Sequence, residues 1–123
     1  MPRFAILHHR TPSHACKPDH YDLLLEDGDV LKTFTLWEFP LVNEPTDAIP
    51  DFDHRMMYLD YEGPISGDRG EVTQADRGSF AWVIREANQI EVELAGATLV
   101  GRLIMRLQDS EMPGAGEASS ATD

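Results

Sequence analysis

A two-residue turn signal, Asp27-Gly28, lies between two runs of strand-forming residues and constrains the fold more than any other feature of the sequence. The flanking residues 20–26 and 30–37 are rich in leucine, threonine and aromatic side chains. A tight hairpin turn requires a positive φ, which glycine adopts without steric cost. The sequence therefore predicts an antiparallel hairpin built from these two runs.

The rest of the chain repeats this pattern of short apolar or alternating runs between turn residues. Further strands are predicted at residues 3–9, 56–61, 71–75, 79–85, 89–94 and 98–107. Residues 38–53 contain three prolines and are predicted to form a connecting loop with at most one helical turn. About eight strands without an amphipathic helix predict an all-β, mainly antiparallel fold, a sandwich or, as we expect, a compact small β-barrel with at most short helical turns.

The composition changes near residue 108, where glycine, alanine, serine, threonine and acidic residues replace the apolar pattern. Segments of this composition cannot bury enough apolar surface to fold. We therefore expect a single domain over residues 1–108, whose core the 41% hydrophobic residues of the chain can supply, followed by a disordered acidic tail over residues 109–123.

The apolar runs are all much shorter than the roughly 18 residues that a membrane span requires, and no signal-peptide pattern opens the sequence. We expect a cytoplasmic, soluble monomer without a membrane partner. The single cysteine, Cys16, excludes an internal disulfide and every zinc site that needs two or more cysteines, and is expected to be an ordinary loop residue.

The net charge of −12 limits which nucleic-acid contacts are plausible. Four of the 22 acids and none of the 10 basic residues lie in the tail, so the domain keeps 18 acids and a charge of −8. Broad binding to nucleic acid depends on lysine and arginine replacing counterions on many phosphates. Any nucleic-acid chemistry must therefore be local, directed at an end or a single phosphate.

The triplet His20-Tyr21-Asp22 is the first candidate for a metal site. On a strand, residues two apart share a face, and their bases lie about 7 Å apart, so the imidazole and the carboxylate can converge on one ion. An isolated pair of this kind is also typical of a surface histidine beside an acid. Three more histidines within the preceding residues 8–14 favour the metal interpretation.

A third ligand would have to come from a neighbouring strand or loop. His8 and His9 end the first predicted strand and point to opposite faces, so only one of them can join. His14, in a loop flanked by proline, is the alternative. The fifth histidine, His54, precedes a predicted strand with Tyr58 on the same face. This pair could hold a phosphoryl oxygen through N–H and O–H donors, or it could be a loop histidine and a half-buried core tyrosine.

Four motifs occur in a specific order and spacing: Phe4-x-Ile6-x-x-His9, His20-Tyr21-Asp22-x-x-x-Glu26, Asp27-Gly28-x-Val30-Leu31-Lys32 and Asp53-His54-x-x-x-Tyr58-x-Asp60-x-Glu62-Gly63. Together they resemble the 3′-phosphoesterase domain of bacterial DNA ligase D and its small stand-alone relatives. The resemblance covers residues 3–82 by motif and residues 83–107 by strand pattern alone. It implies a β-barrel with a manganese-dependent site that removes a 3′ phosphate, or a 3′-terminal ribonucleoside followed by that phosphate, during DNA end repair.

The resemblance also implies roles for individual residues. His9, His20 and Asp22 would be the metal ligands, and His54 and Tyr58 would be catalytic residues that bind the scissile phosphate. Two imidazoles and a carboxylate suit Mn²⁺, although Zn²⁺ or Fe²⁺ would also fit. The expected partners are a nucleic-acid 3′ end or another phosphate ester, and DNA end-joining ligase or polymerase proteins.

The sequence departs from the family pattern at the first ligand. In the ligase-fused domains the first histidine precedes the His-Tyr-Asp triplet by six positions, which is the spacing of His14, whereas His9 precedes it by eleven. The Phe-x-Ile context favours His9. We choose His9 because a strand end fixes a ligand better than a proline-flanked loop does.

Basic residues of the ligase-fused enzymes are also missing. Leu24 and Glu38 occupy two such positions, residues 46–52 contain no basic residue, and only eight residues precede His9 where an N-terminal arm is expected. We predict weaker phosphate and DNA binding unless Arg10, Arg55 or Arg69 compensates, with Arg55 the expected phosphate contact.

Two other functions remain open at this point. The first is a non-catalytic relative that keeps the barrel and binds metal, nucleic-acid ends or a repair partner. The second is an Fe(II) oxygenase with His20, Asp22 and His54 as a facial triad. The chain is short for such an enzyme, and it shows no suitably placed arginine for 2-oxoglutarate.

Overall fold

A computed structural model describes residues 1–15 and 17–108. The predictions for Cys16 and for the tail over residues 109–123 lie outside the described residues. The strands are β1 (Arg3–Arg10), β2 (His20–Asp27), β3 (Val30–Leu36), β4 (Pro45–Pro50), β5 (His54–Arg55), β6 (Gly63–Pro64), β7 (Glu71–Arg85), β8 (Gln89–Gly96) and β9 (Val100–Leu107), and one 3₁₀ helix, η1 (Met56–Asp60), interrupts them. Within the described ranges no α-helix forms, so the all-β prediction is confirmed.

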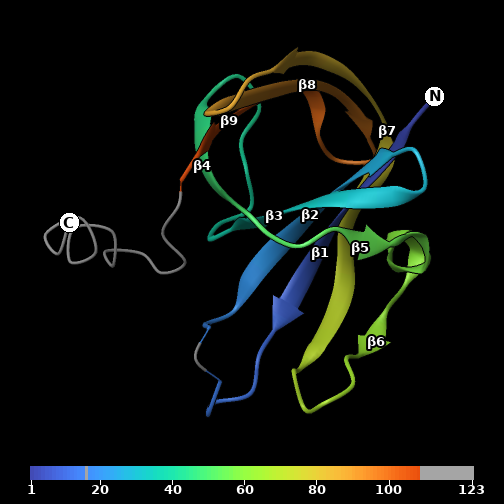
Figure 1. The fold of residues 1–123 in the computed structure, drawn as a ribbon, viewed down its shortest axis with the longest axis vertical. Helices are drawn as coiled ribbons and strands as arrows, with labels where there is room; N and C mark the ends of the chain where they lie inside the picture. Colours follow the sequence, from blue (N-terminus) through green and yellow to red (C-terminus); the bar gives the residue numbers. More distant parts are fainter. Residues whose placement is uncertain (16, 109–123) are drawn as a thin grey trace, which may run out of the picture.

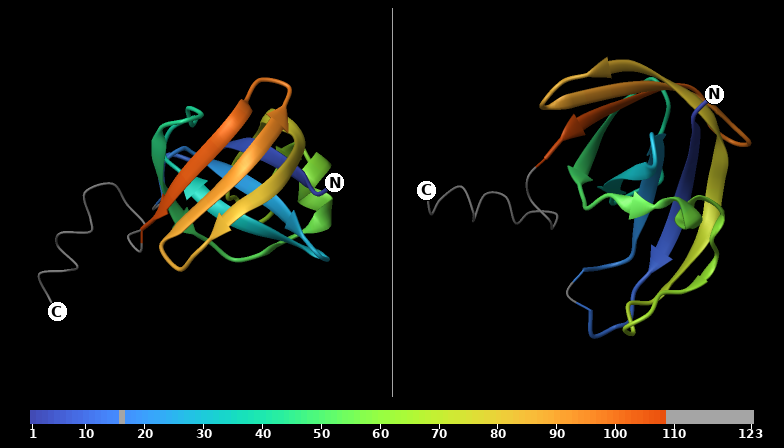
Figure 2. Two further views of the ribbon diagram at one scale, coloured as in Figure 1. Left: turned by 90° about the horizontal axis from the view of Figure 1, so that it is seen from above. Right: turned by 45° about the vertical axis from the view of Figure 1, so that its right-hand side comes forward.

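Seven strands close into a barrel in the order β1-β2-β3-β4-β9-β8-β7, and β7 pairs back onto β1 (Figures 1 and 2). Strand β7 can serve two partners because it is 15 residues long: its first part pairs with β1 and its second part with β8. Only the β4–β9 pair of the barrel is parallel. The predicted compact, mainly antiparallel β-barrel is therefore confirmed.

Strands β1 and β2 are buried on both faces, which explains their nearly continuous apolar runs. One face packs inside the barrel, with Phe4 and Leu23 in a core shared by all seven barrel strands. The other face, which includes Leu7 and Leu24, packs in a second, smaller core with Leu59 of η1. Residues 51–65, here called the cover segment, therefore lie against the outside of the barrel beside β1 and β3 (Figure 1).

The prediction of a loop over residues 38–53 was wrong in part, because β4 lies within it. Pro45 and Pro50 are its first and last residues, where the missing N–H groups leave the centre of the strand free to pair. Strand β4 bonds in parallel to β9, far along the chain, and this pairing closes the barrel.

The predicted strand over residues 56–61 was also wrong, because these residues form η1. The alternation of Met56, Tyr58 and Asp60 suggested a strand face, but the buried anchor of the segment is Leu59, with 2% of its surface exposed. One turn of 3₁₀ helix presents that leucine to the outer core.

The predicted break at Asp76-Arg77-Gly78 does not occur, and β7 runs through it. The buried Asp76 carboxylate instead accepts hydrogen bonds from the backbone N–H groups of Thr98 and Leu99 in the β8–β9 turn. Gly78 is required by close packing between strands, because a Cβ atom there would collide with the Ala95 carbonyl oxygen.

Candidate metal centre and phosphate cavity

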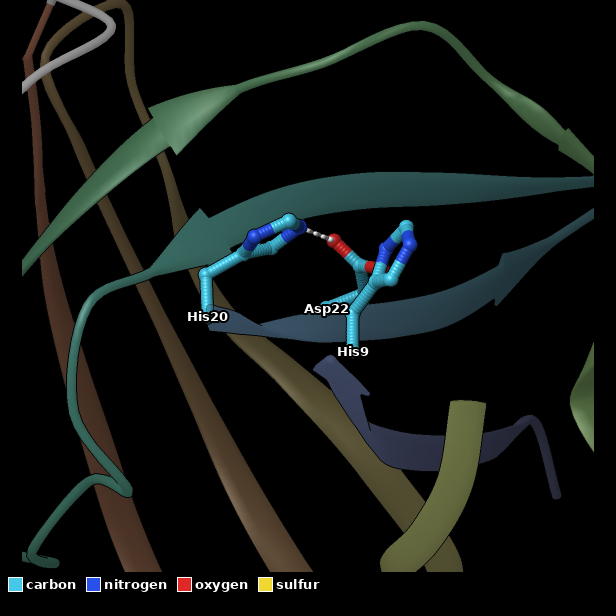
Figure 3. A group of neighbouring side chains, drawn as sticks. All are labelled: His9, His20 and Asp22. Atoms are coloured by element: carbon cyan, nitrogen blue, oxygen red, sulfur yellow. Dashed lines mark hydrogen bonds and ion pairs between the residues drawn. The ribbon is translucent and has the colours of Figure 1, made fainter. Parts of the chain in front are cut away.

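Three of the predicted ligands gather on the outer face of β1 and β2. In the antiparallel register His9 lies directly opposite His20, and Asp22 follows two residues later on the same face. One ligand atom from each residue lies within 4.8 Å of the others. Figure 3 shows the three side chains pointing toward one another. On this face His20 and Asp22 are only 3% and 5% exposed.

The hydrogen bonds of the two imidazoles orient them as metal-binding histidines are usually oriented. His9 Nδ1 lies 3.1 Å from one carboxylate oxygen of Asp22, and His20 Nε2 lies 3.2 Å from the other. The opposite ring nitrogens lie 2.8 Å from backbone carbonyl oxygens, of Arg69 for His9 and of Pro18 for His20, to which they can only donate. Anchoring the far nitrogen on a carbonyl leaves the near nitrogen to face an ion.

The electrostatics of this group favour positive charge at its centre. Burial alone would raise the pKa of Asp22, but hydrogen bonds from His20 and His9 outweigh it and hold that pKa well below its usual range. Burial alone would lower the pKa of His9, but the hydrogen bonds to Asp22 and to the Arg69 carbonyl outweigh it and raise that pKa. Two nitrogens and a carboxylate arranged in this way fit Mn²⁺, Zn²⁺ or Fe²⁺.

The other two histidines of the N-terminal cluster lie outside the group. His8 points to the opposite face of β1 and stacks on Tyr21, with ring centroids 4.7 Å apart. His14 is exposed and its Nε2 lies 3.2 Å from a carboxylate oxygen of Asp68. The geometry thus brings His9 rather than His14 beside His20, despite the longer spacing from the triplet.

The predicted phosphate-binding pair comes from the cover segment. His54 pairs with Leu31 of β3, and its ring lies edge-on to Tyr58, with centroids 5.6 Å apart. His54 Nδ1 donates to the Phe52 carbonyl at 2.9 Å, so Nε2 is the nitrogen left to meet a ligand. A cavity of about 320 Å³ is lined by both members of this pair and by His9, Asp22 and Arg55, among others.

A comparison with known protein families decides which fold family carries this site. The family model of the DNA ligase D 3′-phosphoesterase domain matches residues 12–109, which is most of the chain. The chain belongs to this family. A search of the curated proteins found no match. The match includes His20 and His54, whereas His9 precedes it, so the position of His9 beside His20 is known from the structure rather than from the family match.

Sequence reasoning about this member of the family missed Lys17. The lysine lies in the β1–β2 loop, and its Nζ donates to Thr35 Oγ1 at 2.8 Å and lies 3.6 Å from an Asp51 carboxylate oxygen. It lines a second cavity of about 560 Å³, which shares His9, Asp22, Phe52, His54 and Arg69 with the first.

Leu24 and Glu38, the two positions where the resemblance leads us to expect basic residues, line neither cavity. Leu24 is fully buried in the outer core, which has no room for a hydrated cation, and Glu38 lines a separate hollow beside β4. Arg10, one of the predicted substitutes, pairs with Glu71 at 2.8 Å and lines neither cavity. Arg55 and Arg69 do line the site, and Lys17 joins them.

The two cavities together carry a nearly balanced charge. Their lining contains the three cations just named and four carboxylates, those of Asp22, Asp51, Asp53 and Asp68. With neutral histidines the lining has one net negative charge, which a divalent cation would convert to one net positive charge.

In the described part of the chain no helix is long and apolar enough to cross a membrane.

Proposed function

We propose that this protein is a metal-dependent 3′-end phosphoesterase. It would remove a 3′ phosphate, or a 3′-terminal ribonucleoside followed by that phosphate, from nucleic-acid ends during DNA end repair. One observation carries the proposal: the His54–Tyr58 pair lines the same cavity as His9 and Asp22, two members of the metal-binding group. Membership in the ligase D 3′-phosphoesterase family supports the same reaction class.

In this proposal His9, His20 and Asp22 hold a divalent metal, with Mn²⁺ the first choice and Zn²⁺ the alternative. When bound, the ion would neutralise charge on the phosphate and activate a water molecule for attack. The hydrogen bonds from the far ring nitrogens to the carbonyls of Arg69 and Pro18 support this assignment, because they fix both rings before the ion arrives.

His54, Tyr58 and Arg55 would handle the substrate. The Tyr58 hydroxyl and the Arg55 guanidinium would donate to non-bridging phosphate oxygens as charge builds on them. A protonated His54 would give its Nε2 proton to the departing oxygen, while its Nδ1–H stays on the Phe52 carbonyl. Lys17 and Arg69 would add positive charge at the rim of the site.

Incubation of the protein with Mn²⁺ and a primer-template that ends in a 3′ phosphate tests the proposal, with released phosphate as the readout. His54→Ala should lower the rate by about 100-fold or more, the share that a general acid commonly supplies, and should leave Mn²⁺ affinity unchanged. His20→Ala should abolish both phosphate release and Mn²⁺ binding. If the wild type binds Mn²⁺ but releases nothing, the protein is a non-catalytic relative that binds metal or ends.

A separate oxygen-uptake assay tests the oxygenase hypothesis. The group of three that the structure assembles contains His9 instead of His54, and this favours the phosphoesterase arrangement over a triad of His20, Asp22 and His54. Oxygen uptake with Fe²⁺ that depends on 2-oxoglutarate would reverse the assignment.

The proposal also covers the oligomeric state, the location and the partners of the protein. A monomer acting in the cytoplasm with end-joining ligase or polymerase proteins fits a small domain that processes one end at a time. Light scattering during gel filtration should give the monomer mass of 13.8 kDa. A mass twice as large would contradict this part.

A further inference from the structure

Phe52 is an aromatic side chain at the rim of the candidate site, with 86% of its surface exposed. Isolated exposed apolar residues are normal, so exposure alone has no meaning. Position distinguishes this one. Of the large hydrophobic side chains that are exposed in the described part of the chain, only Phe52 lines the cavities that contain the metal-binding group and His54.

The backbone around Phe52 is held firmly although its ring is exposed. The N–H of Asp51 donates to the Thr33 carbonyl of β3 at 2.9 Å, and the N–H of Phe52 donates to the Asp51 carboxylate at 2.7 Å. The Phe52 carbonyl accepts the hydrogen bond from His54 Nδ1. The segment that presents the ring therefore also orients the imidazole proposed to meet the phosphate.

This arrangement suits a phosphate that is attached to a nucleoside. A small phosphate ester would use His54, Tyr58 and the metal-binding group, and would have no use for an aromatic face beside them. A 3′-terminal nucleotide carries a base on the same sugar as its phosphate, and bases stack on exposed aromatic rings without a requirement for sequence.

We infer that Phe52 is the stacking platform for the base of the terminal nucleotide. The inference rests on the proposed function and deepens it. It assigns Phe52 a binding role and no part in the chemical step.

Two primer-templates test the inference. Both end in a 3′ phosphate, but one terminal residue carries a base and the other is an abasic sugar analogue. Phe52→Ala should lower kcat/KM on the base-bearing end by about 5- to 150-fold, the range expected for the loss of one base–aromatic stack. On the abasic end the variant and the wild type should agree within about twofold, whereas Phe52→Trp should keep the wild-type preference for a base.

Leu41→Ala is the matched control, because Leu41 is an apolar residue with 61% exposure that lines neither of the two cavities. It should leave both rates unchanged. Equal rates for Phe52→Ala and the wild type on the base-bearing end would overturn the inference, as would an equal loss on both ends.

Failure of the proposed function would look different, because the wild type would then release no phosphate from either end. The uncleaved ends would in that case serve as stable ligands for fluorescence anisotropy in the presence of Mn²⁺. Weaker binding of the base-bearing end by Phe52→Ala, with no change for the abasic end, would support the inference. Any other pattern, including no binding, would overturn it.

Discussion

At the scale of single residues, the site depends on which face of a strand each side chain occupies. His8 and His9 are adjacent in sequence, yet one stacks on Tyr21 and the other joins His20 and Asp22. Successive strand residues point to opposite faces, so this separation follows from the backbone alone. The pair therefore offers a test in which the two substitutions are chemically identical.

We expect His9→Ala to weaken Mn²⁺ binding by more than about 100-fold, because the loss of even a hydrogen-bond partner of a metal ligand costs roughly 10- to 100-fold. His8→Ala and His14→Ala should bind Mn²⁺ as the wild type does. Titration calorimetry measures the Mn²⁺ affinity of all three variants. Loss of affinity in His14→Ala with normal affinity in His9→Ala would show that the first ligand is wrongly assigned.

The raised pKa of His9 should make Mn²⁺ binding more sensitive to acid than it would be with an ordinary histidine of pKa 6.5. Metal and proton compete for the same nitrogen, so affinity should fall as the pH drops through the raised pKa, starting above pH 6.5. The carboxyl of Asp22, with its depressed pKa, should contribute no proton there. Calorimetry in two buffers of different ionisation enthalpy counts the released protons, and a count of zero at pH 6.5 would contradict this prediction.

The same shift has a consequence for the metal-free fold. A histidine whose pKa is raised on folding stabilises the folded state fully below its unfolded value of 6.5, and this stabilisation is lost as the pH rises through the folded pKa. The metal-free protein should therefore lose this contribution to stability over the same pH range in which Mn²⁺ binding becomes strong.

At the scale of elements, local signals in the sequence predicted some strands and site residues and missed others. The β2–β3 hairpin was predictable because Gly28 needs only its own positive φ of 68° to make the turn. Strand β4 was not predictable, because its main partner is β9 at the other end of the domain. Likewise His20 and Asp22 followed from a spacing of two, whereas Lys17 reaches the site through the fold of a loop that no periodic pattern describes.

The cover segment contains His54 and Tyr58, the proposed phosphate-binding pair, and Leu59 anchors it in the outer core. Leu59→Ala should lower the free energy of unfolding by about 2–5 kcal/mol, the usual effect of this substitution in a core. It should also reduce phosphate release more than Mn²⁺ affinity, because His54 and Tyr58 belong to the cover segment while the ligands belong to β1 and β2. Urea unfolding measures the free energy of unfolding, a turnover assay measures phosphate release, and titration calorimetry measures the Mn²⁺ affinity.

Met57→Ala is the matched control within the same 3₁₀ helix, because Met57 is 55% exposed. It should change stability by no more than about 0.5 kcal/mol. If Leu59→Ala were destabilised but kept normal turnover, the cover segment would not position the phosphate-binding pair.

At the scale of the whole molecule, an acidic protein must approach an acidic substrate. The chain carries −12, and among the residues that the structure describes the cations that line the two cavities are Lys17, Arg55 and Arg69, to which a bound metal ion would add. Extended cationic surfaces bind nucleic acid through contacts with many phosphates, and salt strongly weakens this binding. A site with three cations can neutralise only a few phosphates, which is consistent with recognition of an end.

This limit predicts a shallow dependence of rate on salt. Each neutralised phosphate contributes about 0.7 to 0.9 to the slope of log affinity against log salt concentration, so log kcat/KM on a 3′-phosphate end should fall with a slope of magnitude about 2 to 3. Lys17→Met should reduce that magnitude by about one. Arg85→Met should not change it, because Arg85 pairs with Asp27 and neither residue lines the two cavities. A slope steeper than about 6 would mean that a larger part of the surface contacts the nucleic acid, and that the three cations at the site are not its main electrostatic contact.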